Sequence, residues 1–120
     1  MKYLLLIYQA PGAFDALPED ERKALMGEFD LLNRELAESG EFVNGAALAH
    51  PENSRTVRVR AGVPAVTDGP FAEAKEQLAG FYIVDVENIE RATEIALRDP
   101  ASRLWAIEVR PVMDEAGLEM

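Results

Sequence analysis

The sequence contains no cysteine. This absence excludes disulfide frameworks, thiolate metal sites and catalysis by a cysteine nucleophile. A chain without cysteine suits a reducing compartment, and we expect a cytoplasmic protein.

Histidine is almost as scarce, because His50 is the only one in the chain. A divalent metal would have to bind carboxylates such as Asp68, Glu73 and Glu76, and we expect neither a native metal site nor a cofactor. The sequence also lacks a GxGxxG motif, a phosphate-binding P-loop, a zinc pattern and a GxSxG motif, so the dinucleotide, nucleotide and serine-hydrolase classes lose their usual support.

Positive charge is sparse as well. The chain has 12 Lys and Arg residues against 22 Asp and Glu residues, which gives a net charge of −10. Nucleic-acid binding needs a concentrated positive surface, and we expect no nucleic-acid partner. Arg55, Arg58 and Arg60 form the only close basic cluster. Two interpretations of this cluster stay open, a solvated strand face or a wall that binds an anion.

Long apolar runs are absent too. No stretch approaches the roughly 20 apolar residues of a membrane span, and the run after Lys2 is shorter than the core of a signal peptide. We therefore expect no membrane association and no targeting segment. A chain of 120 residues, 48% of them hydrophobic, fits one globular domain, which we place at residues 1–112, with a tail at 113–120.

What the chain does contain is an ordered series of strand and helix signals. One helix is expected between Pro18 and Gly40, with its apolar face on Leu25, Phe29, Leu32 and Leu36. A second helix is expected between Asn88 and Pro100, with Ile89, Ala92, Ile95 or Ala96 on its apolar face. The expected strands are residues 2–9, 42–48, 55–60, 63–68, 78–86 and 104–112.

The resulting order, β-α-β-β-β-β-α-β, indicates an α+β protein of the split β-α-β, ferredoxin-like class, with an antiparallel sheet and two helices on one face. The other face of the sheet would then be bare. We expect it to be covered by a second copy in a homodimer whose sheets face each other. The apolar residues assigned to that face are Leu4, Leu6, Tyr82, Val84, Trp105 and Ile107.

The stretch VTDGPFAEAKEQ, residues 66–77, holds most of the polar candidates. Asp68 has two interpretations, a general base in a cleft or a turn residue whose carboxylate accepts backbone N–H bonds. Lys75 and Glu76 either act on Asp68 and an anionic ligand or belong to a solvated helical turn. On the last strand, Glu108 and Arg110 either bind a ligand carboxylate or form a cross-strand ion pair.

Tyr8, Tyr82 and Trp105 are the aromatic candidates. They either line a pocket on the face of the sheet between subunits, or belong to a dimer core with satisfied polar tips. We favour the core role for Trp105 and leave the two tyrosines open.

The run DGPFAEAKEQLAGFYIVDV, with the opening MKYLLLIY and the closing IEVRPV, resembles the YCII-related family, specifically its DGPF branch. The resemblance implies a ferredoxin-like subunit in a dimeric α/β barrel. Relatives outside this branch use a His-Asp pair, and one type is a dehydrochlorinase for a chlorinated hydroxyquinol. The first helix of this chain and the loop before it contain no histidine. The family also occurs beside extracytoplasmic-function sigma factors, which implies a regulatory association.

We predict a small cofactor-free enzyme that acts on a small polar or aromatic molecule by proton transfer in a dimer cleft, with isomerase-like or lyase-like chemistry. The predicted catalytic residues are Asp68 as the base, Lys75, or alternatively Arg110, as the anion stabiliser, and Tyr82, or alternatively Tyr8, as the hydroxyl donor. The predicted ligand contacts are Tyr8, Gly69, Pro70, Phe71, Glu76 and Arg110. The alternative is a non-catalytic dimeric module with a ligand-binding or regulatory role.

Overall fold

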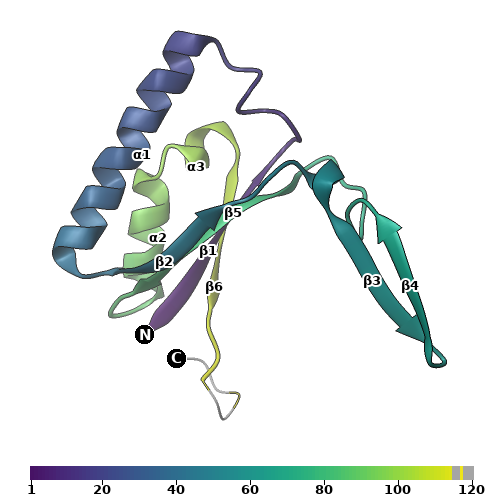
Figure 1. Ribbon diagram of the computed structural model, residues 1–120. Coiled ribbons are helices and arrows are strands. Elements are labelled where there is room, and N and C mark those ends of the chain that lie inside the picture. The colour runs from purple at the N-terminus through teal and green to yellow at the C-terminus, as the bar shows by residue number, and fades with distance from the viewer. Residues whose placement is uncertain (115–116, 118–120) are drawn as a thin grey trace.

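A computed structural model describes residues 1–114 and 117 of the chain (Figure 1). The remaining residues of the predicted tail, 115, 116 and 118–120, lie outside the described residues. The elements in chain order are β1 (Lys2–Gln9), α1 (Glu19–Ser39), β2 (Phe42–Ala47), the 3-10 helix η1 (Pro51–Asn53), β3 (Arg55–Arg60), β4 (Val63–Asp68), β5 (Gln77–Asp85), α2 (Ile89–Arg98), α3 (Ala101–Leu104) and β6 (Ala106–Pro111).

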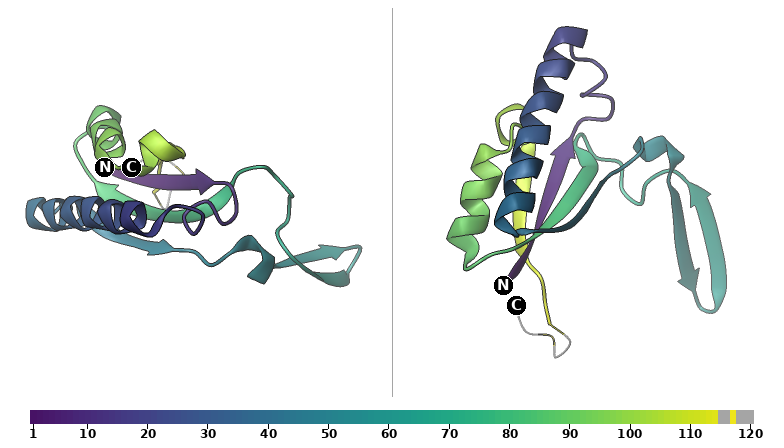
Figure 2. Two further views of the ribbon diagram at one scale, coloured as in Figure 1. Left: turned by 90° about the horizontal axis from the view of Figure 1, so that it is seen from above. Right: turned by 60° about the vertical axis from the view of Figure 1, so that its left-hand side comes forward.

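Four strands form the main sheet in the order β2-β5-β1-β6, and every neighbouring pair is antiparallel. The other two strands, β3 and β4, pair only with each other in a separate sheet. This arrangement confirms the predicted α+β class with antiparallel pairing, and it is consistent with a ferredoxin-like subunit. In Figures 1 and 2 the β3–β4 hairpin extends away from the four-stranded sheet and its helices.

The two long helices are bounded by the residues that the sequence indicates. Helix α1 follows Pro18 and carries Glu19, Asp20 and Glu21 in its first turn, where negative charge interacts favourably with the helix dipole. It ends at Gly40, whose φ of 78° is a left-handed conformation that glycine adopts without strain. The carboxamide of Asn88 caps α2 by accepting a hydrogen bond from the backbone N–H of Arg91 at 2.9 Å.

One hydrophobic core joins the helices to a single face of the sheet. Leu32 and Leu36 of α1 and Ile95 of α2 pack in the same cluster as Leu5 of β1 and Val84 of β5. Burial of these side chains supplies the main driving force for holding the two helices on that face. Ile89, which we assigned to the apolar face of α2, is instead exposed.

The assignment of residues to the two faces of the sheet needs a correction. Tyr82, Val84 and Ile107 lie on the face covered by helices, since Val84 belongs to the core and the other two pack against it. Apolar residues occupy both the odd-numbered and the even-numbered positions of β5, so the hydrophobic pattern does not distinguish the two faces of this strand. Pairing with β1 decides the matter, because Tyr82 stands opposite the core residue Leu5.

A second correction concerns the segment after α2. Residues 101–104 form the short helix α3, and the last strand begins at Ala106 rather than at 104. Pro100 ends α2 and also suits the start of a new helix, because its fixed φ is already helical. The Asp99 side chain accepts a hydrogen bond from the N–H of Ala101 at 2.8 Å, which holds the first turn of α3.

A third correction applies to residues 72–76, AEAKE, which we read as helix-prone. The structure has no helix there, only bends between the hairpin and β5. The side-chain amide of Gln77 donates hydrogen bonds to the carbonyl oxygens of Ala72 and Ala74, at 3.1 and 3.2 Å. A segment this short rarely forms a helix without tertiary packing, because helix nucleation is unfavourable.

A bidentate ion pair ties the start of β2 to α2. The guanidinium of Arg91 donates to both carboxylate oxygens of Glu41, with N–O distances of 2.8 and 2.9 Å. The hydrogen bond from Arg91 is the main cause that lowers the pKa of Glu41 from 4.5 to about 2. Glu94 also pairs with Arg91, at 3.2 Å, but its side chain is much more exposed than that of Glu41.

We expect the Glu41→Gln variant to lose less stability in acid than the wild type does. Because the folded pKa of Glu41 lies below its unfolded value, the ion pair stabilises the fold fully above about pH 4.5, and this contribution is lost as the pH falls toward about 2. Urea unfolding at a series of pH values measures the effect. Glu94→Gln is the matched control and should keep the wild-type acid dependence; an unchanged acid dependence in Glu41→Gln would contradict the assignment.

Candidate functional site

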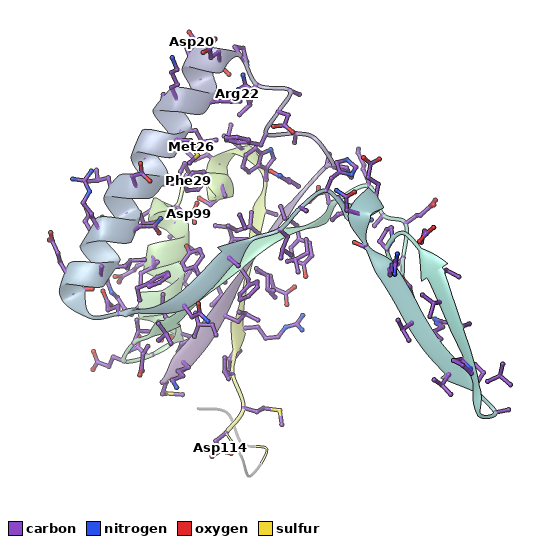
Figure 3. The ribbon with its side chains drawn as sticks, viewed as in Figure 1. Asp20, Arg22, Met26, Phe29, Asp99 and Asp114 are labelled. Atoms are coloured by element: carbon purple, nitrogen blue, oxygen red, sulfur yellow. The ribbon has the colours of Figure 1, made fainter. Side chains whose placement is uncertain are left out.

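A cavity of about 420 Å³ lies between α1 and the face of the sheet that carries the helices. This volume is in the range of small-molecule sites. Aromatic and other apolar side chains from both layers form much of its wall. Members of this apolar wall are Ile7, Phe14, Met26, Phe29, Leu32, Phe42 and Trp105. Figure 3 shows Met26 and Phe29 of α1 on the same side of the molecule as Asp99, which also lines the cavity.

Small residues on β2 and β5 leave the space that the cavity occupies. Gly45, Ala46 and Ala47 of β2 line it together with Ala79 and Gly80 of β5. A Cβ added at Gly45 would stand 2.7 Å from the Cβ of Tyr82 and 2.8 Å from the carbonyl oxygen of Phe81. Any larger residue at Gly45 would therefore displace Tyr82 or the β5 backbone.

The polar centre of the cavity wall is a hydrogen bond between Tyr82 and Asp99. The Tyr82 hydroxyl donates to Oδ2 of Asp99 at 2.7 Å, and the N–H of Ala101 donates to Oδ1 at 2.8 Å. Asp99 is only 1% exposed, and it lies at the junction between α2 and α3. The bond thus joins a central strand of the sheet to the turn that connects two helices.

Burial sets the proton affinity of this pair. It is the main cause that raises the pKa of Asp99, while the hydrogen bonds from Ala101 and Tyr82 and the charge of Arg103 act in the opposite direction. Burial also raises the pKa of Tyr82 far above its ordinary value, with further contributions from the charge of Asp99 and the hydrogen bond to it. The phenol therefore keeps its proton at neutral pH, and the carboxyl group has more affinity for a proton than an exposed Asp.

Other polar side chains reach the same cavity. Gln9, Asp30 and Asn33 line it, and Trp105 supplies an indole ring. Amide and indole N–H groups are hydrogen-bond donors that carry no charge. Among the described lining residues there is no Lys, Arg or His. The wall therefore favours a neutral or cationic ligand over an anionic one.

A second cavity of about 350 Å³ adjoins the first and shares Gln9, Phe14, Ala47 and Ala79 with it. His50 lies in its wall. The Nδ1 atom of His50 accepts a hydrogen bond from the N–H of Glu52 at 3.2 Å, so the histidine caps η1.

The residues of the DGPF stretch lie outside both cavities. The side chain of Asp68 is 95% exposed at the end of β4, where its carboxylate stands 3.9 Å from the Nε of Arg55. The N–H of Gly69 donates to the carbonyl oxygen of Ser54 at 2.7 Å, and the Thr56 hydroxyl donates to the carbonyl oxygen of Gly69 at 2.9 Å. These bonds close the open end of the β3–β4 hairpin.

The other predicted site residues lie in three places: the segment after the hairpin, the helix-free face of the sheet and the cavity. Phe71 is exposed and lies under the guanidinium of Arg58, with 4.4 Å between the Arg58 Cζ and the ring centroid. Pro70, Lys75 and Glu76 belong to the same segment, and neither cavity includes them. The roles predicted for these residues stay predictions.

Tyr8 and Arg110 lie on the face of the sheet without helices. Register places Tyr8 with Leu4 and Leu6 on one side of β1, and pairs Leu4 with Arg110 on β6. Arg110 forms an ion pair with Glu108 of its own strand, so the pair is not the cross-strand contact that we considered. Tyr82 and Trp105, by contrast, line the cavity between α1 and the sheet, on the face that carries the helices, and not a pocket on the helix-free face.

Asp99 is the residue that sequence reasoning missed. A signal for it exists, because an acidic residue directly after a helix meets the negative end of the helix dipole and needs a compensating partner. The step Asp99-Pro100 also permits a new helix, and the N–H of its first residue, Ala101, donates to that carboxylate. Its contact with Tyr82 spans 17 residues and could not be inferred from local pattern.

Comparison with known proteins assigns the family. The model of the YCII-related domain matches residues 1–116, nearly the entire chain. This chain belongs to the YCII-related domain family. It is 33% identical over 114 residues to an uncharacterized protein of Rhizobium meliloti (strain 1021), and the match covers 93% of this chain and 92% of that protein. The predicted family is thereby confirmed, while membership of the DGPF branch stays a prediction.

The described part of this YCII-related protein has neither a cluster of metal ligands nor a helix that could span a membrane. Within residues 1–114 and 117, no three His, Cys, Asp or Glu side chains come together in a way that could hold a metal ion. None of the helices in that part of the chain combines the length and hydropathy of a membrane span.

Removing the Tyr82 hydroxyl should destabilise the fold. Tyr82→Phe leaves Oδ2 of buried Asp99 without its donor, and an unsatisfied buried polar group costs about 1–3 kcal/mol. Urea unfolding measures the change. Tyr8→Phe is the matched control, because the same atom is removed from a tyrosine outside the cavity, and we expect it to stay within about 0.5 kcal/mol of wild type. Equal stability of wild type and Tyr82→Phe would show that the bond contributes nothing net.

Proposed function

We propose that this YCII-related protein binds a small neutral or cationic molecule in the cavity between α1 and the sheet, and transfers a proton from it through Tyr82 and Asp99. The observation that carries the proposal is the 2.7 Å hydrogen bond between the Tyr82 hydroxyl and a carboxylate that is almost completely buried. A hydroxyl and a carboxylate in contact form a relay that can move a proton without a cofactor.

The proton path starts at a carbon next to a carbonyl group of the ligand. The C–H bond breaks as its proton passes to the Tyr82 oxygen, while the original Tyr82 proton passes to Oδ2 of ionised Asp99. The electron pair stays on the ligand as an enolate. Burial raises the pKa of Asp99, which makes its carboxylate a better acceptor for that proton than an exposed Asp.

Two outcomes complete the reaction. Return of the proton to a different carbon gives an isomerisation, and departure of a leaving group with its electron pair gives an elimination, after which Asp99 releases its proton to water. Uncharged donors in the wall, the amides of Gln9 and Asn33 and the indole of Trp105, would stabilise the enolate oxygen. These are the isomerase-like and lyase-like reactions expected from the sequence.

The wall also defines the class of ligand. Its aromatic side chains favour a planar or apolar body, and its amide groups favour a carbonyl or hydroxyl group on the ligand. An anionic ligand would meet Asp30 and Asp99 with no cation among the described lining residues. We therefore propose a neutral aromatic or alicyclic ketone, hydroxyketone or lactone.

The assembly belongs to the same proposal. We propose that two chains form a homodimer with the helix-free faces of their sheets toward each other, as in a dimeric α/β barrel. The cavity described above lies within one subunit, so ligand binding does not require the dimer cleft. Asp68 and Lys75 remain candidates for a separate site at that cleft.

A second candidate function is ligand binding without turnover, in a regulatory module. The observation that favours it is the bonding of Asp99, because both carboxylate oxygens already accept a hydrogen bond, from Tyr82 and from Ala101. A satisfied pair of this kind can serve structure alone. The association with sigma factors implied by the family would then concern this ligand-bound form.

The first experiment is a thermal-shift screen with neutral ketones, hydroxyketones and lactones, followed by incubation of each stabilising compound with the protein in D2O. A ligand at 100 times its dissociation constant stabilises by about 2.7 kcal/mol, which is a readable shift. We expect mass spectrometry to detect deuterium at the carbon next to the carbonyl. The rate in Tyr82→Phe should fall by at least about 100-fold, the usual range for a lost acid–base group.

Asp68→Asn is the matched control for this experiment. It should bind and exchange as the wild type does, because Asp68 lies outside both cavities. Loss of exchange in Asp68→Asn with full exchange in Tyr82→Phe would transfer the chemistry to the DGPF stretch. Binding without exchange in the wild type would favour the regulatory module.

A further inference from the structure

The β3–β4 hairpin, residues 55–68, forms an arm that has little contact with the rest of its own chain. In Figures 1 and 2 it lies apart from the four-stranded sheet. The radius of gyration is 16.5 Å, against about 14 Å for a compact chain of this length. An isolated two-stranded hairpin is marginally stable at best in water. The arm therefore needs a surface that the described part of its own chain does not provide.

One face of this arm is apolar. Register places Val57 opposite Val66 and Val59 opposite Pro64, all four on the same side of the two strands. Arg55 and Asp68, which pair with each other, stand at the open end of that side. Each of the three valines is more than half exposed. The opposite side carries Arg58 and Arg60 with Thr56 and Thr67. The hairpin thus has the alternation of a sheet with one buried face, although no part of the chain within residues 1–114 and 117 buries that face.

The turn at the tip shows that the hairpin is a well-defined element. Ala61 and Gly62 have φ values of 50° and 76°, and they join β3 to β4 as a two-residue loop. Positive φ at both positions is the type I′ geometry, whose twist matches that of paired strands. The pairing continues from Arg60 and Val63 down to Arg55 and Asp68. The exposed valines are therefore held in a fixed row.

Charge indicates what covers the arm. It contains Arg55, Arg58, Arg60 and Asp68, which gives the arm a net charge of +2. Because the whole chain has a net charge of −10, the residues outside the arm have a net charge of −12. The body of the same molecule is therefore a strongly acidic partner for its basic arm. Arg58 and Arg60 lie on the side of the arm away from its apolar face, so this attraction acts at long range and steers association.

We infer that the apolar face of the arm packs on the acidic body of a second copy of this chain, and that each copy embraces the other with its arm. A twofold symmetric dimer makes this contact twice, which covers both arms at once. The inference specifies a contact surface for the homodimer proposed above, and it does not depend on the ligand or reaction proposed for the cavity.

The test is the dissociation constant of the dimer, measured by sedimentation velocity over a range of protein concentrations. Val57→Thr and the double variant Val57→Thr/Val66→Thr replace valine by a residue of similar shape that also favours strands. We expect Val57→Thr to raise the dissociation constant at least about tenfold, which corresponds to about 1.4 kcal/mol. The double variant should raise it further.

Val63→Thr is the matched control. Val63 is 65% exposed and Val57 is 66% exposed, but Val63 lies on the opposite side of the arm. We expect it to change the dissociation constant less than about twofold, within the scatter of neutral surface substitutions. High NaCl should weaken the wild-type dimer, because part of the attraction is between opposite charges. Circular dichroism and thermal unfolding verify that the variants keep the fold.

A thiol label gives an independent readout. Because the chain has no cysteine, Val57→Cys and Val63→Cys each introduce a unique reactive group. The thiol at position 57 should react more slowly with a disulfide reagent at high protein concentration than at low, and the thiol at position 63 should react equally fast at both.

Three results would overturn the inference. A wild type that stays monomeric at all concentrations would reject the arm contact together with the homodimer. A dimer that Val57→Thr leaves unchanged would reject the arm contact alone. Equal weakening by Val57→Thr and Val63→Thr would show that the apolar face is not the contacting side.

Discussion

The hydrogen bond between Tyr82 and Asp99 is the constraint on which the site depends. It joins β5, an inner strand of the sheet, to the junction of α2 and α3. Asp99 accepts this bond and the N–H of Ala101 at the same time, so one buried carboxylate holds both the phenol and the first turn of α3. A buried carboxylate is tolerated only when it is bonded in this way. These contacts fix the position of the carboxylate, while burial is the main cause that raises its pKa.

The cavity beside this bond exists because the sheet carries small residues where α1 crosses it. Gly45 and Gly80 leave no side chain there, and Gly45 permits β2 to approach Tyr82 closely. Apolar residues of α1 then form the opposite wall instead of filling the space. The core beyond the cavity, around Leu36, Ile95 and Val84, is fully packed. The fold thus combines a buried core with a buried polar pair in the wall of an adjacent cavity, which is the arrangement expected of a binding site.

The β3–β4 hairpin is structurally separate from the cavity and from the main sheet. Its strands are inserted between β2 and β5, yet they add nothing to the main sheet. The DGPF stretch closes the open end of the hairpin, where Gly69 bonds to Ser54 and Thr56. In this structure the stretch therefore positions the arm, and the cavity is formed by other parts of the chain. Site and arm are separate, so a defect in one need not disturb the other.

The sequence alone determined the class of fold, because periodicity, caps and turn residues are local properties. Pro18, Gly40 and Asn88 bound the two long helices as predicted, and Ala61-Gly62 reverses the hairpin. It did not determine which face of β5 meets the helices, since Tyr82 and Phe81 belong to opposite faces of a strand that is apolar on both. Strand pairing with β1 made that choice. The partner of Tyr82 could not be predicted from the sequence either, because Asp99 contacts Tyr82 only when α2 packs on the sheet. Burial then raises the pKa of the Asp99 carboxyl group, and no local sequence pattern encodes that shift.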